Sequence, residues 1–181
     1  MTPEFGAINP FRQIPAFVDT DGTGMSDTNA IIFYIASKYA PEYLQVEKGP
    51  NAIWALEAST SYLYSGGWTD VCYPCFGFKE APADGNYDAA KEKLTKNMTT
   101  FGDTFLKAKF IGGDTLCVAD FKIAPLVEAM MHPHVKATTG YECPERFVTW
   151  LKDFKEACPG AAMLSSAGGF SIAEYLTSKM A

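Results

Sequence analysis

The chain has 181 residues, of which 48% are hydrophobic and 14% aromatic, and its formal net charge at pH 7 is −6. This length suffices for one well-cored domain or two small ones. Because the chain is acidic and its Lys and Arg residues are scattered, nucleic acid and anionic membrane surfaces are excluded as expected partners.

The sequence carries no feature that would direct the chain out of the cytoplasm. The opening residues MTPEFGAINP lack the basic start and the apolar core of a secretory signal. The most apolar window, residues 118–131, contains charged side chains and is too short to span a bilayer. The 5 cysteines are an odd number, which favours free thiols in a reducing compartment. We therefore expect a cytoplasmic protein.

The first elements predicted along the chain form a β-hairpin and a helix. Residues 14–18 read as a short strand, DTDGTG (19–24) as a turn, and residues 24–26 as the returning strand. The stretch 26–41 predicts a helix that ends at Pro41. One buried face of that helix is expected from the apolar residues at helical spacing, namely Ile31, Ile32, Ile35, Ala36 and Tyr39.

The rest of the chain shows helical periodicity only. A helix over residues 52–68 would place Trp54, Ala58, Tyr62 and Trp68 on one stripe, with Gly66-Gly67 weakening its end. Further helices are predicted over the ranges 87–110, 117–131 and 145–158, and a last one begins at a Ser171–Glu174 capping box. Residues 79–86 and 132–144 are expected to be connections.

These elements predict two units. Residues 1–41 form a partial α/β domain, 42–50 a linker that ends in Gly-Pro, and 51–181 an all-helical domain. The fold class is therefore a β-hairpin plus helix followed by a helical bundle, mostly α overall.

The CYPC motif contains Cys72 and Cys75 and could be a redox dithiol or half of a zinc site. A redox pair needs its first Cys after a strand and at a helix N-terminus, whereas this motif lies inside the helical region. A zinc site needs further ligands, and His132 and His134 are distant in sequence. We therefore expect ordinary thiols and no metal site.

A binding site is indicated by the pairing of QIP (13–15) with SDTNAI (26–31). Pro15 cannot pair in a sheet, which leaves the backbone of Ile14 open to an extended peptide unless the stretch is a plain loop. Thr28 lies where a helix begins and offers an anion site, and Asp27 can accept from an ammonium group. The alternative is that Thr28 or Ser26 merely caps the helix.

Four stretches together resemble the cytosolic glutathione transferases: TPEF, NPFRQIPAF, DTNAI and GGDTLCVADF. The family pattern is N-P-x-x-x-(I/V)-P, then (E/Q/D)-S-x-A-I, then G-(D/E)-x-(L/I)-(T/S)-x-A-D. The spacing is similar over nearly the whole chain. The resemblance implies a thioredoxin-like domain, here only a remnant, followed by an all-helical domain.

The resemblance also implies a glutathione site. Pro15 matches the family's cis-proline, so that the QIP turn, Gln13, Ile14 and Pro15, would hold the cysteinyl backbone of glutathione. Asp27 and Thr28 match the acidic residue and the serine that hold the γ-glutamyl group. Glutathione is thus the expected co-substrate.

Three departures from the family pattern change the expected function. Asp120 matches the buried helix-capping aspartate, but Cys117 replaces the Ser or Thr that it pairs with. CYPC has no counterpart in the motifs. The family places a strand-helix-strand unit with its catalytic Tyr, Ser or Cys before Asn9, and 8 residues precede Asn9 here. We therefore assign no catalytic residue.

Two classes of function remain open. The first is a glutathione transferase-like protein with a partial site, which conjugates glutathione to electrophiles only if the missing N-terminal segment is supplied. The second is a non-catalytic interaction module, such as the similar domain in the gamma subunit of the translation elongation factor 1 complex, or a structural subunit. A homodimer or a larger protein complex is expected in either case.

Overall fold

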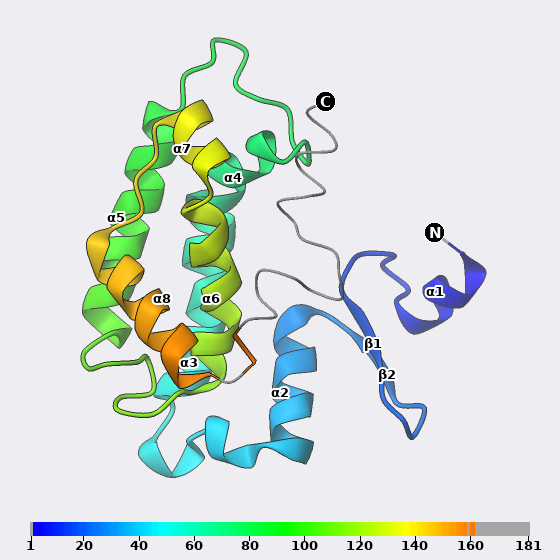
Figure 1. The fold of residues 1–181 in the computed structure, drawn as a ribbon. Helices are drawn as coiled ribbons and strands as arrows, with labels where there is room; N and C mark the ends of the chain where they lie inside the picture. The colour runs from blue at the N-terminus through cyan, green and yellow to red at the C-terminus, as the bar shows by residue number, and fades with distance from the viewer. Residues whose placement is uncertain (1, 159, 162–181) are drawn as a thin grey trace.

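The structure is a computed structural model that describes residues 2–158 and 160–161, and it places a small hairpin unit beside a bundle of helices (Figure 1). Strands β1 (Ala16–Val18) and β2 (Gly24–Ser26) pair antiparallel, with Phe17 opposite Met25. Helix α2 (Thr28–Tyr39) lies between this hairpin and the bundle. The predicted hairpin and helix, and the mostly helical fold class, are confirmed.

The other elements form the N-terminal turn, the connection after α2 and the bundle. In chain order they are α1 (Pro3–Ile8), η1 (Pro41–Tyr43), η2 (Val46–Lys48), α3 (Asn51–Ala58), η3 (Ser59–Trp68), α4 (Thr69–Cys75), α5 (Asp88–Phe105), α6 (Val118–Met130), α7 (Pro133–Thr139) and α8 (Glu145–Ala157). None of the helices in the described part of the chain is both long enough and apolar enough to cross a membrane.

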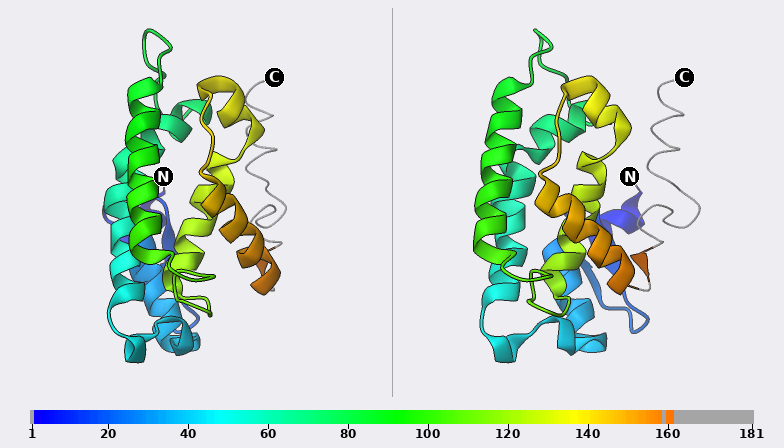
Figure 2. Two further views of the ribbon diagram at one scale, coloured as in Figure 1. Left: turned by 90° about the vertical axis from the view of Figure 1, so that its left-hand side faces the viewer. Right: turned by 60° about the vertical axis from the view of Figure 1, so that its left-hand side comes forward.

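Helix α6 lies within the bundle and packs against α3 and α8 (Figure 2). The prediction of a central buried helix over residues 117–131 is confirmed. The stripes on α5 and α8 are buried as expected; they are formed by Leu94, Met98, Phe101 and Phe105 on α5, and by Phe147, Trp150, Leu151 and Phe154 on α8.

The prediction of a single continuous helix over residues 52–68 is wrong. The chain runs from α3 into the π-helical segment η3, and Gly67 adopts φ +136 before α4 begins. A π turn contains more residues than an α turn, so side chains rotate out of the α-helical register. Trp54 and Tyr62 are 54% and 63% exposed, while Trp68 is buried, so the three do not share one buried stripe.

Three further elements differ from the sequence-based expectation. Helix α1 was not expected, although Thr2 accepts a hydrogen bond from the Phe5 N–H as its N-cap and Pro3 opens it. The expected helix over 87–110 ends at Phe105. Helix α7 occupies the expected connector over 132–144. The predicted helix that starts at Ser171 lies outside the described residues.

The face of α2 is also less buried than its pattern predicts. Ala36 is buried and Ile32 packs against the core, but Ile35 and Tyr39 are exposed. Only part of the apolar stripe is therefore buried.

The buried Asp120 carboxylate caps α6 and also binds the loop after α5 and helix α8. Its Oδ2 accepts from the Cys117 N–H at 2.8 Å and from the Gly112 N–H at 3.4 Å. Its Oδ1 accepts from the Ile111 N–H and from Trp150 Nε1, both at 3.0 Å. Asp120 is 0% exposed, and burial raises the pKa of its carboxyl while these hydrogen bonds oppose that rise. The expected structural role of Asp120 agrees with these contacts.

We expect Asp120→Ala to lower the free energy of unfolding by about 3 kcal/mol, the upper end for one orphaned buried donor, because several donors lose one acceptor together. A denaturant melt of each variant gives this difference. Asp114→Ala, an exposed change in the same loop, is the control and should stay within about 0.5 kcal/mol of the parent chain. A small effect of Asp120→Ala would contradict the capping role.

Candidate functional site

A cleft of about 580 Å³ lies between the hairpin unit and the bundle. One wall is the loop before β1, the floor is the start of α2, and the other wall comes from η3 and α6. The structure brings all the sequence-predicted ligand residues to this one cleft, namely Gln13, Ile14, Pro15, Asp27 and Thr28. It also adds Asn9, the first residue of the N-P-x-x-x-(I/V)-P motif, and two residues outside the motifs, Tyr64 and Lys122.

The loop wall presents a free backbone edge. The Ile14-Pro15 peptide bond is cis, as expected, and Ile14 is 82% exposed. Within the described chain neither the N–H nor the C=O of Ile14 is hydrogen-bonded, because strand pairing starts at Ala16. Asn9 holds the loop in place: its side chain donates to the Gln13 carbonyl and accepts from the Phe11 N–H.

The floor is the N-terminus of α2, and its cap is Asp27. The Asp27 Oδ1 accepts from the N–H groups of Asn29 and Ala30 at 2.9 and 3.3 Å. The alternative that Thr28 or Ser26 caps this helix is therefore wrong. Among the residues described, the half-buried Thr28 hydroxyl has no hydrogen-bond partner and stays free at the helix start.

The bundle wall contributes an aromatic ring and an ammonium group. The Lys122 Nζ lies over the Tyr64 ring, 6.0 Å from its centroid. Burial lowers the pKa of Lys122, and the charges of Asp27 and Glu57 oppose that shift. The hydroxyl groups of Tyr64 and Tyr73 are hydrogen-bonded to each other. Burial raises the pKa of Tyr64 above its usual range. The sequence signal for Lys122 is its position as a lysine in an otherwise apolar helix.

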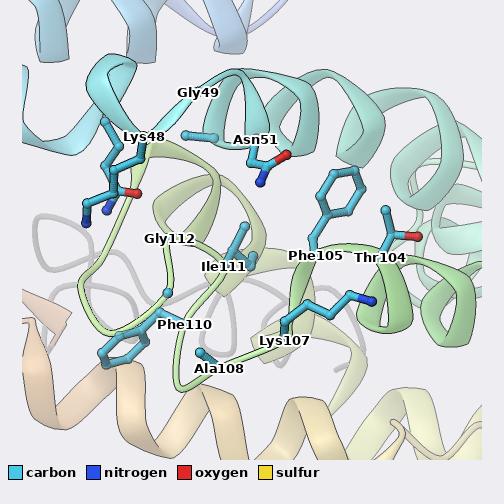
Figure 3. Close-up of a pocket in the computed structure, with 13 residues that line it drawn as sticks. Lys48, Gly49, Asn51, Thr104, Phe105, Lys107, Ala108, Phe110, Ile111 and Gly112 are labelled. Atoms are coloured by element: carbon cyan, nitrogen blue, oxygen red, sulfur yellow. The ribbon is translucent and has the colours of Figure 1, made fainter.

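A second cavity of about 190 Å³ lies elsewhere, between the start of α3 and the loop after α5 (Figure 3). Its lining includes Lys48, Asn51, Phe105, Lys107 and Gly112. It contains none of the sequence-predicted ligand residues. We therefore regard the first cleft as the candidate site.

The CYPC motif lies on α4, away from both cavities. Cys72 and Cys75 are free and buried, and burial raises the pKa of both thiols. The Cys75 thiol donates to the Val71 carbonyl. A buried thiol with a raised pKa is a poor nucleophile and a poor redox group.

A cluster of titratable groups joins the hairpin to α2 at Asp19. This nearly buried carboxylate accepts from the hydroxyls of Tyr34 and Tyr39 and from Lys38 Nζ, at distances of 2.7 to 2.8 Å. Lys38 also binds Asp21. The hydrogen bond from Lys38 is the main cause that lowers the pKa of Asp19. Lys38 is also the main cause that lowers the pKa of Asp21, to about 2. The sequence analysis missed this network.

Comparison with curated proteins identifies plant glutathione transferases as relatives. The chain is 32% identical over 145 residues to glutathione S-transferase F10 of Arabidopsis thaliana, which covers 75% of this chain and 66% of the relative. It is 29% identical over 155 residues to glutathione S-transferase 3 of Zea mays, covering 75% and 68%. The chain thus spans about two thirds of the length of these relatives. No family model matches.

Solved structures share the fold. A delta-class glutathione transferase of Nilaparvata lugens matches with a TM-score of 0.73 at 23% identity, over 98% of this chain and 81% of that one. A glutathione S-transferase-I bound with lactoylglutathione matches with a TM-score of 0.71 at 22% identity, over 90% and 78%.

We expect metal removal to leave the protein unchanged. Incubation with a chelator should not alter the melting temperature, because the Cys72 and Cys75 thiols are buried and protonated. A drop of several degrees would contradict this expectation, since a structural zinc ion contributes directly to folding.

We expect the stabilising effect of Asp19 to depend on pH. Its pKa is lowered from 3.8 on folding, so its contribution is complete above that pH and is lost as the pH falls towards the folded-state value. Asp19→Asn should therefore destabilise the chain at pH 7, and the difference from the parent should shrink below about pH 4. Melts across the pH range measure this. A difference that is constant with pH would contradict it.

Proposed function

Because the chain belongs to the cytosolic glutathione transferase superfamily, we propose that the cleft binds glutathione. The observation that carries the proposal is the convergence of a free backbone edge at Ile14 with the N-terminus of α2 in one cleft. An extended peptide backbone can pair with Ile14, as in strand addition. The γ-glutamyl carboxylate would then lie against Thr28 and its ammonium group against Asp27.

We propose further that this part of the chain binds the thiol substrate and does not activate it. Activation needs a group that stabilises the thiolate at neutral pH. The phenol in the cleft, Tyr64, has a raised pKa and is bonded to Tyr73. Conjugation of an electrophile would therefore require a thiol-activating group from outside the described cleft.

A steady-state assay with glutathione and an electrophilic dye tests this second step. We expect binding of glutathione in the millimolar range and negligible conjugation by the 181-residue chain alone. Micromolar binding together with normal turnover would contradict the division between binding and activation.

One observation favours an interaction module as the second candidate. Trp54 and Tyr62 are exposed and border a groove of about 170 Å³ against Phe101 and Phe105 of α5. Exposed aromatic side chains around a groove are typical of protein interfaces. A second copy of this chain or another subunit would bury them, as expected for a homodimer or for a domain like that of the elongation factor gamma subunit. Sedimentation of the chain at several concentrations tests for self-association.

The Thr28 hydroxyl gives a direct test of glutathione binding. Thr28→Ala should weaken binding by about 1–2 kcal/mol, because one hydrogen bond to a carboxylate is lost. Thr99→Ala removes an exposed hydroxyl on α5 and should have no effect. Calorimetric or NMR titration gives both values. Equal affinity of the two variants would remove Thr28 from the site.

A further inference from the structure

Lys122 is a cation in the cleft without an anionic partner. It lines the cleft from α6, two residues after the capping Asp120. No salt bridge within 4.0 Å includes it among the residues the structure describes, and its nearest assigned partner is the Tyr64 ring. Every other residue that lines the cleft is neutral except Asp27.

The ammonium group of Lys122 lies on the bundle wall of the cleft, and the Asp27 carboxylate lies on its floor. Asp27 uses Oδ1 to cap α2, and its other oxygen makes no hydrogen bond within the described residues. Helices α2 and α6 pack against each other, which holds the floor of the cleft against its bundle wall. Asp27 and Glu57 act electrostatically on Lys122 without pairing with it. The cleft therefore offers one negative and one positive pole with space between them.

We propose that Lys122 binds the α-carboxylate of the γ-glutamyl group, opposite Asp27, so that the cleft recognises an amino-acid zwitterion at this end of the ligand. The proposal rests on the proposed binding of glutathione. An α-amino acid carries its ammonium and carboxylate on one carbon atom, so a site that binds both groups needs an acceptor and a cation that face the same space. The Thr28 hydroxyl and Lys122 share the carboxylate, and Asp27 takes the ammonium group.

The partial burial of Lys122 makes this contact favourable. An ammonium group that has lost part of its hydration gains from an anion that arrives in the same low-dielectric cleft. The Tyr64 ring supports the cation while the ligand is absent. The contact would also make the cleft selective. A peptide whose first residue lacks the α-carboxylate would leave the Lys122 ammonium group unpaired.

The test uses the full chain, two ligands and three variants. The ligands are glutathione and its analogue with the γ-glutamyl α-carboxylate replaced by hydrogen. We expect Lys122→Gln to weaken glutathione binding about tenfold, the scale of a hydrogen bond between charged groups at a partly exposed site. Lys122→Arg, which keeps the charge, should retain most of the affinity. Lys96→Gln removes one exposed positive charge from α5 and is the control.

The analogue separates this role from a merely structural one. It should bind the unmodified chain about tenfold more weakly than glutathione does, and Lys122→Gln should weaken it no further. The measurement on the unmodified chain needs no variant to fold. If Lys122→Gln weakens the binding of both ligands equally, or of neither, the assignment of Lys122 is overturned. In that case a loss of affinity in Thr28→Ala can still support glutathione binding. If the unmodified chain binds neither ligand, the proposed function and this inference both fall.

Discussion

A single buried carboxylate sets the position of one wall of the cleft. Asp120 accepts hydrogen bonds from the loop after α5, from the start of α6 and from Trp150 on α8. A buried charge is tolerable only when its oxygens are satisfied in this way. Lys122 follows Asp120 by two residues on the same helix, so the bonds that hold the start of α6 also hold the backbone from which Lys122 extends.

The opposite wall depends on a different polar network. The two-stranded hairpin is too small to be stable in water by itself. Its attachment to α2 comes from Asp19, which collects hydrogen bonds from Tyr34, Lys38 and Tyr39, and its loop is held by Asn9. These bonds thus hold the start of α2 in position relative to Ile14. Polar side chains add to the apolar core of α6 on one side of the cleft and hold the hairpin on the other.

The sequence predicted those parts of the fold that depend on local spacing. The stripes of α5 and α8, the hairpin turn and the cap at Asp120 follow from periods and positions along one segment. The π-helical course of η3 was not predictable, because it depends on the contact of Gly67 with Leu94 on another helix. For the site, motif residues came together in one cleft, whereas Lys122 and Tyr64 could be placed there only once α6 and η3 were oriented. Asp27 as the cap, in place of Thr28, depends on a positive φ that the sequence does not show.

The charge of the whole chain gives the last reason to expect a cation in the cleft. The formal net charge is −6, and glutathione is itself an anion at neutral pH. Long-range repulsion therefore opposes the approach of the ligand, and salt screens it over about 10 Å or less. The backbone edge at Ile14 and the α2 start supply only partial charges against this repulsion. Lys122 supplies a full positive charge inside the cleft, where the lower dielectric strengthens its attraction. The proposed binding of glutathione by this acidic chain therefore depends on that local field.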